Sequence, residues 1–358
     1  REERMARRVA RLWSTVLLVS TATAISPSPA MPWRRRALQT ALHVASAEED
    51  DTDYYGLRFN GLQPLYGDGA RERLAAARVC VVGLGGVGSW AVEALARSGL
   101  GALTLIDLDE ICISNTNRQL HALKGTVGSS KAQVLADRVA MINPECDVVV
   151  REEWVTRSNA RVRVSRFKSR PVGPMRLRRS QSAQIRPSHR WRPPRPPAPR
   201  ARDGTPRAQV MLEEEAARGA PDAPFAVLDA IDGYLEKAAL IDACGTSSTL
   251  AARAHFVTVG AAGGKADPTA VRRGDLTVAT NDALLKRVRQ TLRKQYGYPA
   301  GQPHEGGRVW NVAAIYSTEN ARRPSREGTS CDRFGTACFA TGAFGFAAAA
   351  FVTGAIAG

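Results

Sequence analysis

Short apolar runs and amphipathic segments alternate along the chain from residue 78 onwards. The first run contains Val79, Val81 and Val82, and β-branched residues in so short a run are typical of a parallel strand covered on both faces. Apolar residues at helical spacing predict helices between the runs. The predicted strands are 79–82, 102–107, 146–152, 225–232, 255–264 and 310–319, and the predicted helices are 87–97, 129–142, 234–244 and 282–296. This alternation predicts an α/β fold with a Rossmann-like, doubly wound and mostly parallel sheet.

A glycine-rich turn lies between the first predicted strand and the first predicted helix. Glycines in such a turn let the backbone approach a phosphate, and the helix that follows presents free N–H groups. Asp107 ends the next strand, nineteen residues after the last glycine, where an acid commonly receives ribose hydroxyls. NAD, FAD, ATP and a turn without ligand all remain open at this point. The predicted nucleotide-binding glycines are Gly83, Gly85, Gly86 and Gly88.

Polar and basic residues follow Asp107 closely and favour a triphosphate. A dinucleotide site needs no such cluster, whereas Arg and Lys neutralise the charge that builds on a leaving pyrophosphate. We therefore predict ATP as the nucleotide, with Arg118 and Lys131 facing its phosphates. The cluster consists of Asn115, Asn117, Arg118, Gln119 and Lys131.

These motifs carry a resemblance to a known family. The segments G-x-G-G-V-G-S, I-D-x-D and S-N-x-N-R-Q, with the later lysine, resemble the E1-like adenylating superfamily of the ThiF type, which uses this fold for ATP. The segment N-T-N-R-Q-x-H-A-L is similar to the tRNA threonylcarbamoyladenosine dehydratase branch of that superfamily. The resemblance covers residues 56–157 and 225–350 and implies one adenylating domain across 52–358.

The resemblance implies a reaction and its partners. ATP would activate the threonyl carboxylate of N6-threonylcarbamoyladenosine in tRNA as an acyl-adenylate. A carbamoyl nitrogen would then expel AMP and close a hydantoin ring, without a protein nucleophile, because the attacking group is held intramolecularly. The implied cofactors are ATP and Mg²⁺. The implied partners are the tRNA substrate, a second copy in a homodimer, and a sulfur-transfer or desulfurase protein.

The resemblance also implies roles for single residues. Arg118, Lys131 and Asp232 match the catalytic positions, and Asp232 would help to position the nucleotide and Mg²⁺. Arg58 is the candidate for a phosphate contact in the partner subunit's site, with an ordinary surface arginine as the alternative. The neighbouring acid, Asp229, is predicted to be a structural capping residue. Gly233 departs from the sulfur-carrier branch, which often has Asn at that position.

Two other functions remain open from the sequence. One is an adenylyltransferase that activates the C-terminus of a ubiquitin-like or sulfur-carrier protein. That function favours C-x-x-C zinc pairs or a nucleophilic cysteine, and the sequence contains no C-x-x-C, so no zinc site is predicted. The other is an NAD-sensing or inactive scaffold, for which Arg118 or Lys131 would be dispensable. The cysteines are Cys80, Cys112, Cys146, Cys244, Cys331 and Cys338.

The formal charge of +16 belongs to two biased segments and does not describe the catalytic body. Residues 161–207 contain fifteen Lys or Arg and one Asp, and residues 1–36 contain eight Arg and two Glu, so the remainder is mildly acidic. Nine prolines in 161–207 exclude regular structure there. We interpret 158–222 as a disordered Arg/Pro-rich insertion, either neutral, translated from non-coding sequence, or able to bind RNA.

The N-terminal residues 1–47 have the composition of a targeting segment. Basic residues precede the apolar run Leu12–Val19, and a basic stretch rich in Ser, Thr and Ala then continues without an acid as far as Glu48. Met5 is a candidate start within this segment. The layout predicts import into an organelle, a plastid in the first place and a mitochondrion as the alternative.

Two further helices have two interpretations each. The helix 282–296 is basic on one side and predicts either a solvated face or contact with an RNA backbone. Residues 335–358 are uncharged and long enough for a membrane span, but their Ala and Gly content favours a buried C-terminal helix around the segment Phe344 to Phe346. No stable membrane insertion is therefore expected.

Overall fold

The computed structural model describes residues 53–152, 207–299, 309–322 and 334–358. The predicted targeting segment and the part of the predicted insertion before residue 207 lie outside these ranges. The chain divides into two units, Arg1–Asp53 and Tyr54–Gly358, and the account below concerns the second.

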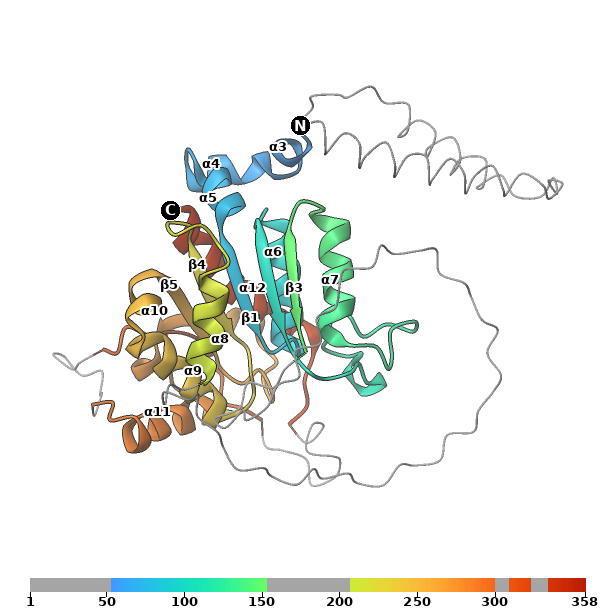
Figure 1. Cartoon of the computed structure of the whole chain (residues 1–358). Coiled ribbons are helices and arrows are strands. Elements are labelled where there is room, and N and C mark those ends of the chain that lie inside the picture. The colour runs from blue at the N-terminus through green and yellow to red at the C-terminus, as the bar shows by residue number, and fades with distance from the viewer. Residues whose placement is uncertain (1–52, 153–206, 300–308, 323–333) are drawn as a thin grey trace, which may run out of the picture. The chain divides into compact units, whose positions relative to one another are not determined.

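One seven-stranded sheet forms the centre of this unit, in the order β3-β2-β1-β4-β5-β7-β6 (Figure 1). All neighbouring strands are parallel except β6 and β7, which are antiparallel. The doubly wound, mostly parallel sheet predicted from the sequence is therefore confirmed. The strands are β1 (Arg78–Val82), β2 (Ala102–Ile106), β3 (Asp147–Arg151), β4 (Phe225–Asp229), β5 (Ala254–Val259), β6 (Val271–Asp275) and β7 (Ala313–Ser317).

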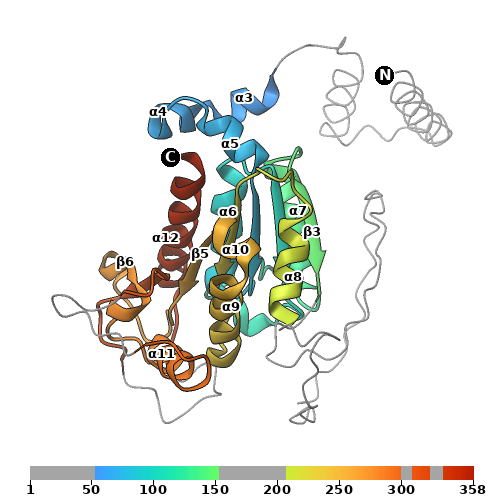
Figure 2. The ribbon, with the colours of Figure 1, turned by 60° about the vertical axis from the view of Figure 1, so that its left-hand side comes forward.

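Helices cover both faces of the sheet, as Figures 1 and 2 show. On β1, Val79 and Val81 pack into one core, whereas Cys80 and Val82 pack into the other, because successive side chains of a strand point to opposite faces. The first face carries α5 (Ala70–Ala76), α6 (Gly86–Arg97), α7 (Lys131–Ile142) and α12 (Cys338–Ala357). The second carries α8 (Arg207–Ala216), α9 (Tyr234–Thr246), α10 (Ser248–Arg253) and α11 (Ala283–Gln295). Two short helices, α3 (Tyr54–Phe59) and α4 (Gln63–Tyr66), precede α5.

The strands β1, β2 and β4 end at the same level. Val82 on β1 lies opposite both Ile106 on β2 and Asp229 on β4. From β1 the chain winds outward to β2 and β3, and it then crosses back to β4 on the other side. Ligands of open α/β sheets bind at this point of reversal, beyond the carboxyl ends of the strands. The fold therefore brings the glycine turn, Asp107 and the end of β4 to one crevice.

The C-terminal helix α12 packs across α6 and the sheet. Phe344 is buried in the core, which confirms the predicted buried helix, but Phe346 is half exposed and forms a T-shaped ring contact with Trp90. A Cβ on Gly345 would lie 2.6 Å from the carbonyl oxygen of Val87, so the two helices are in backbone contact there. By length and composition α12 could cross a membrane, with a mean hydropathy of 1.7, yet 56% of that window is buried inside the fold.

The C-terminal boundary predicted for the insertion lies too far along the chain. The sequence predicts its end at residue 222, but α8 occupies Arg207–Ala216 and belongs to the fold. Met211, Leu212 and Ala216 are buried against the second face of the sheet. The apolar positions of α8 are few and stand beside three consecutive glutamates, which made the helix resemble the low-complexity sequence before it.

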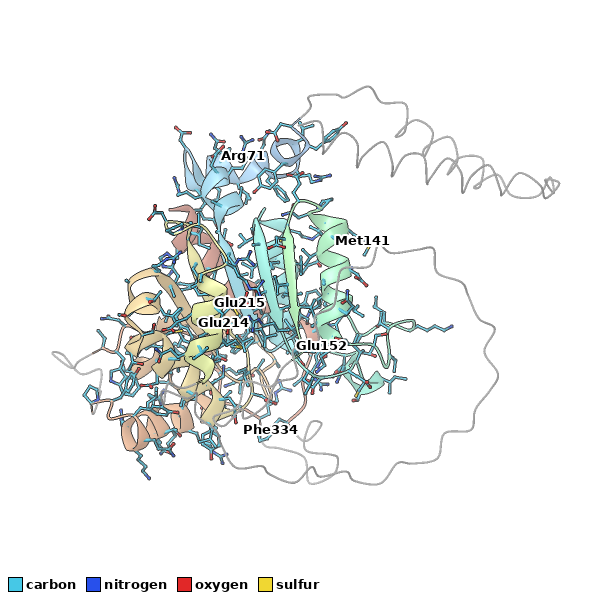
Figure 3. The ribbon with its side chains drawn as sticks, in the orientation of Figure 1. Arg71, Met141, Glu152, Glu214, Glu215 and Phe334 are labelled. Atoms are coloured by element: carbon cyan, nitrogen blue, oxygen red, sulfur yellow. The ribbon has the colours of Figure 1, made fainter. Side chains whose placement is uncertain are left out.

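One of these glutamates, Glu215, is completely buried and joins α8 to the sheet (Figure 3). The hydroxyl of Thr104 on β2 donates a hydrogen bond of 2.6 Å to its carboxylate. Arg151 at the end of β3 forms an ion pair with it, and Arg218 forms another at 3.0 Å. The neighbouring Glu214 also pairs with Arg151, at 3.1 Å, but it is largely exposed.

We expect Glu215→Gln to lower the free energy of unfolding by roughly 3 kcal/mol, because it breaks a buried ionic cluster and leaves Arg151 without its buried counter-charge. The matched variant Glu214→Gln removes an exposed pair to the same arginine and should change stability by less than about 1 kcal/mol. Urea unfolding of both variants measures the difference. Equal losses would show that Glu215 does not join α8 to the sheet in this way.

Candidate active site

In the glycine turn after β1, two glycines lie so close to neighbouring backbone atoms that a side chain would not fit there. Gly83 has a positive φ of 87°, and a Cβ there would lie 2.9 Å from the carbonyl carbon and oxygen of Ala230. A Cβ on Gly88 would lie 1.8 Å from the carbonyl oxygen of Gly83. These two glycines therefore pack the turn against the end of β4 and against α6. Gly85 is different, because a Cβ there would meet only the side chain of Gln119, at 3.8 Å.

Gly85 and Gly86 mark the start of α6, where free N–H groups point out of the helix. Gly85 is the N-cap residue of α6, and no side chain caps this helix end. The open surface beside Gly85 leaves room for a phosphate, which a helix N-terminus favours electrostatically. A Cβ on Gly86 would lie 3.0 Å from the methyl group of Thr341, so of the four predicted glycines Gly85 has the most open surroundings, and contact of any of them with a nucleotide stays a prediction.

Asp107 ties the glycine turn to β2. Its Oδ2 accepts a hydrogen bond of 2.7 Å from the N–H of Leu84, and its Oδ1 accepts one of 2.8 Å from the N–H of Asp109. Burial raises the pKa of Asp107, although the positive charge of Lys131 and these two N–H groups act in the opposite direction. Each carboxylate oxygen keeps a second lone pair, so the predicted contact with ribose hydroxyls is compatible with the geometry.

Lys131 is the first residue of α7, as predicted, and its side chain is only 7% exposed. Its Nζ lies 2.7 Å from Oδ2 of Asp109, and its own N–H donates to the carbonyl oxygen of Asp109 at 3.1 Å. An ammonium group has three donors, so one acceptor leaves Lys131 able to bind phosphate oxygens. The cap of α7 was predicted at Ser129, but the hydroxyl that accepts from the N–H of Gln133 belongs to Ser130.

Arg118 lies on the loop that follows the short helix η3 (Ile113–Asn115). Its Nη1 donates to the carbonyl oxygen of Ser114 at 2.8 Å and to Oδ1 of Asn117 at 3.0 Å. Its carbonyl oxygen lies 3.5 Å from the position of a Cβ on Gly86. The structure therefore brings Arg118 to the start of α6, beside the glycine turn.

The two predicted asparagines both shape this loop. Asn115 is buried, and its Oδ1 accepts from the N–H of Cys112 at 3.0 Å, which closes η3. Asn117 is exposed, and its Nδ2 donates to the carbonyl oxygen of Thr336 at 2.9 Å. A direct contact of either asparagine with a nucleotide stays a prediction.

Two further residues of the same loop are buried with polar atoms that have no hydrogen-bond partner within the described part of the chain. They are Gln119, through Oε1, and His121, through both ring nitrogens. Burial, together with the charge of Lys131, lowers the pKa of His121 to about 4, so the imidazole is neutral near pH 7. Sequence reasoning gave His121 no role, although it belongs to the segment N-T-N-R-Q-x-H-A-L.

The acids at the end of β4 have separate roles. Asp229 is fully buried, pairs with the equally buried Lys237 at 3.1 Å and accepts from the hydroxyl of Thr258 at 2.7 Å. Its Oδ1 accepts from the N–H of Ile231, which confirms the predicted capping role. Asp232 follows this turn and is exposed at the same end of the sheet as the glycine turn. Asp232 is therefore an exposed carboxylate just beyond the end of β4.

Arg58 lies away from this crevice. It forms an exposed ion pair of 3.0 Å with Glu145, which precedes β3 and so lies beyond the amino ends of the strands. The glycine turn lies beyond their carboxyl ends, so Arg58 does not reach the site of its own chain. The predicted contact with a partner subunit's site stays a prediction.

Several basic side chains of α11 are engaged in contacts with the rest of the protein, so fewer of them are available to a partner than the sequence suggests. Arg289 donates to the carbonyl oxygens of Leu276 and Ala279, at 3.1 and 2.8 Å. Arg287 lies over the ring of Tyr234, and Arg293 lies over that of Trp310. Within the described part of the chain, Lys286 and Lys294 are the basic residues of this helix that are exposed without such a contact.

The described cysteines are mostly unsuited to nucleophilic catalysis. Burial raises the pKa of Cys146 and of Cys244 to about 12 and that of Cys80 well above its usual value. Cys112 and Cys338 are exposed, and Cys331 lies outside the described ranges. Among the described residues, no three His, Cys, Asp or Glu side chains gather in a way that could hold a metal ion.

Comparison with known proteins finds relatives of this chain both in sequence and in structure. The model of the ThiF family matches residues 59–169. The tRNA threonylcarbamoyladenosine dehydratase of Escherichia coli is 35% identical over 286 residues, which are 80% of this chain and 82% of that protein. The crystal structure of the E. coli enzyme in complex with ATP superimposes with a TM-score of 0.61 at 33% identity, over 85% of this chain and 96% of that one.

A shorter similarity reaches the adenylyltransferases. The molybdopterin-synthase adenylyltransferase of Salmonella typhimurium is 45% identical over 78 residues, which are 22% of this chain and 31% of that protein. This similarity is confined to a small part of the chain, whereas the similarity to the dehydratase extends over most of it.

We expect Arg118→Ala and Lys131→Ala each to lower ATP-dependent pyrophosphate release by roughly a hundredfold or more, because each removes a cation that stabilises the leaving group. A coupled pyrophosphate assay measures the rate, and circular dichroism verifies the fold. Lys124→Ala removes an exposed lysine of the same loop and serves as the matched control. Activity near that of the wild type in either site variant would refute the assigned role.

His121 should make the protein less stable as the pH falls. Between pH 6.5 and about 4 the unfolded chain binds a proton on this ring and the folded chain does not, so acidification favours unfolding. His121→Gln should remove this component, which amounts to about 3 kcal/mol across the window. Urea unfolding at a series of pH values measures it, with the exposed His255→Gln as control. An unchanged pH dependence in His121→Gln would contradict the burial argument.

Proposed function

Since the chain belongs to the ThiF family, we propose that it catalyses the ATP-dependent dehydration of N6-threonylcarbamoyladenosine in tRNA. The proposal is supported above all by two cations near the predicted nucleotide site, since the main chain of Arg118 lies beside Gly86 and the charge of Lys131 acts on Asp107, whereas a site for NAD needs no such charges. The extended similarity to the E. coli dehydratase supports the substrate. The match of this chain to most of that enzyme in its ATP complex supports the nucleotide.

In the first half of the reaction, the formation of the acyl-adenylate, each of these residues has a separate role. The start of α6 at Gly85 and Gly86 receives phosphate through backbone N–H groups, and Asp107 receives the ribose. The threonyl carboxylate attacks the α-phosphorus of ATP, and the bond to pyrophosphate breaks. Arg118 and Lys131 neutralise the negative charge that moves onto the departing pyrophosphate.

The second half requires no protein nucleophile. A carbamoyl nitrogen attacks the carbonyl carbon of the acyl-adenylate, AMP leaves, and a proton is lost from the nitrogen. The net change in the nucleoside is the loss of one water. The buried cysteines, whose pKa values are raised, are consistent with this route.

We propose Mg²⁺ as the companion of ATP, with Asp232 as its protein ligand. Mg²⁺ prefers hard oxygen ligands and is commonly held by one or two carboxylates together with substrate phosphates. Asp232 is exposed in the crevice and supplies such an oxygen, whereas Asp229 is already engaged by Lys237 and Thr258. The donor set fits an ion that arrives with the triphosphate.

We further propose a homodimer in which Arg58 reaches the partner subunit's site, and a sulfur-transfer protein as a second partner. These proposals rest on the resemblance of the motifs. The exposed Lys286 and Lys294 of α11 are candidates for contact with the tRNA backbone. We also propose import into a plastid or mitochondrion, on the basic and acid-free composition before Glu48.

Threonylcarbamoylated tRNA incubated with the full-length protein, ATP and Mg²⁺ should lose one water from the modified adenosine, as seen by mass spectrometry of its nucleosides. Omission of ATP and the Arg118→Ala variant should each prevent the change. An unchanged nucleoside, together with ATP–pyrophosphate exchange that requires a small carrier protein, would replace this proposal with adenylyltransferase activity.

A further inference from the structure

Two helices that are distant in sequence meet at the main chain of Arg118. The indole N–H of Trp90 on α6 donates to the carbonyl oxygen of Arg118 at 3.1 Å. The hydroxyl of Thr341 on α12 donates to the same oxygen, also at 3.1 Å. A carbonyl oxygen has two lone pairs, so it can accept from both donors at once. The position of Arg118 is therefore fixed jointly by the two helices.

The start of α12 also holds the side chain of Arg118, through one intermediate. The guanidinium donates to Oδ1 of Asn117, and Nδ2 of Asn117 donates to the carbonyl oxygen of Thr336, just before α12. Both amide atoms of Asn117 are thus used to link the arginine to this segment. Main chain and side chain of Arg118 are anchored to the same short stretch.

We propose that the first turn of α12 positions Arg118 for catalysis, with Thr341 as the positioning residue. The inference rests on the proposed role of Arg118 in ATP chemistry. It assigns to the C-terminal helix a function beyond its packing in the core, because the arginine is 223 residues away in sequence from the hydroxyl that holds it. The loop of Arg118 acquires its working geometry only when α12 is docked.

The Thr341 hydroxyl has one proton and three acceptors within reach, of which the carbonyl oxygen of Arg118 is the nearest. The carbonyl oxygens of Cys338 and Ala337 lie 3.2 and 3.3 Å from it. Its methyl group packs 3.0 Å from the position of a Cβ on Gly86, so the residue fills the space between α12 and the start of α6. Valine has the same shape, and Thr341→Val therefore keeps the packing while it removes the donor to Arg118.

The same helix supplies a matched control. Thr353 is as buried as Thr341, at 2% against 3% exposure, and its hydroxyl has no hydrogen-bond partner among the described residues. Thr353→Val therefore removes a buried hydroxyl from α12 without touching the loop of Arg118. Thr341→Ser restores the donor and should recover the activity that Thr341→Val loses.

Steady-state kinetics of ATP consumption on threonylcarbamoylated tRNA give the first readout. We expect Thr341→Val to lower kcat by roughly threefold to tenfold, the effect of one net hydrogen bond, with little change in the KM for ATP. Thr353→Val should match the wild type, and the Tm of both variants should be similar. Equal kcat values for Thr341→Val and Thr353→Val would overturn the proposal.

Hydrogen exchange gives a second readout that needs no activity. The amides from Arg118 to Leu120 should exchange faster in Thr341→Val than in the wild type, and at the wild-type rate in Thr353→Val. Unchanged exchange in Thr341→Val would overturn the positioning role even in an active enzyme. A wild-type protein without ATP-dependent activity would instead refute the proposed function, while the exchange result would still decide whether α12 holds the loop.

Discussion

The backbone contact between Gly83 and Ala230 is the constraint on which the site depends. It can form only because β1 and β4 end at the same level and because neither Gly83 nor Gly88 carries a side chain. The contact aims the start of α6 into the crevice where the order of strands reverses. Asp107 then ties this turn to β2 through the N–H of Leu84. The start of α6 and the carboxylate of Asp107 are thus held together by this main-chain packing and one hydrogen bond.

Buried ion pairs join residues of the fold that lie outside the contact between Gly83 and Ala230. Such pairs add little net stability over apolar replacements, yet breaking one costs about 3–5 kcal/mol, so their contribution is to geometry. Lys237 is fully buried, and its ammonium contacts Asp229 and Thr258, which makes it structural. Lys131 contacts Asp109 with its ammonium, which has two further donors, and its proposed role is to bind phosphate. Two buried lysines of this fold are therefore assigned different roles because their surroundings differ.

The elements that were predicted correctly are those that depend on residues close together in the sequence. The run Arg78–Val82, its glycine turn and the following helix form one local unit, and the later positions of Arg118 and Lys131 followed from motif spacing. Prediction from the sequence failed for elements whose structure depends on tertiary contacts. The helix α8 looked like the insertion before it, and the edge strand β6 contains two exposed arginines with no apolar alternation. The contact of Thr341 with Arg118 joins residues too distant for any local pattern.

The position of α12 explains why similarity over the nucleotide-binding part alone is a weak guide to this chain. The adenylyltransferase similarity covers 22% of the chain, whereas that to the E. coli dehydratase covers 80%. Arg118 needs both Trp90, close to the glycine turn, and Thr341, in the last helix. A segment with the glycine turn and the loop of Arg118 would therefore contain this arginine without its contact to Thr341. In this chain the C-terminal helix contributes a hydrogen bond to the loop that carries Arg118.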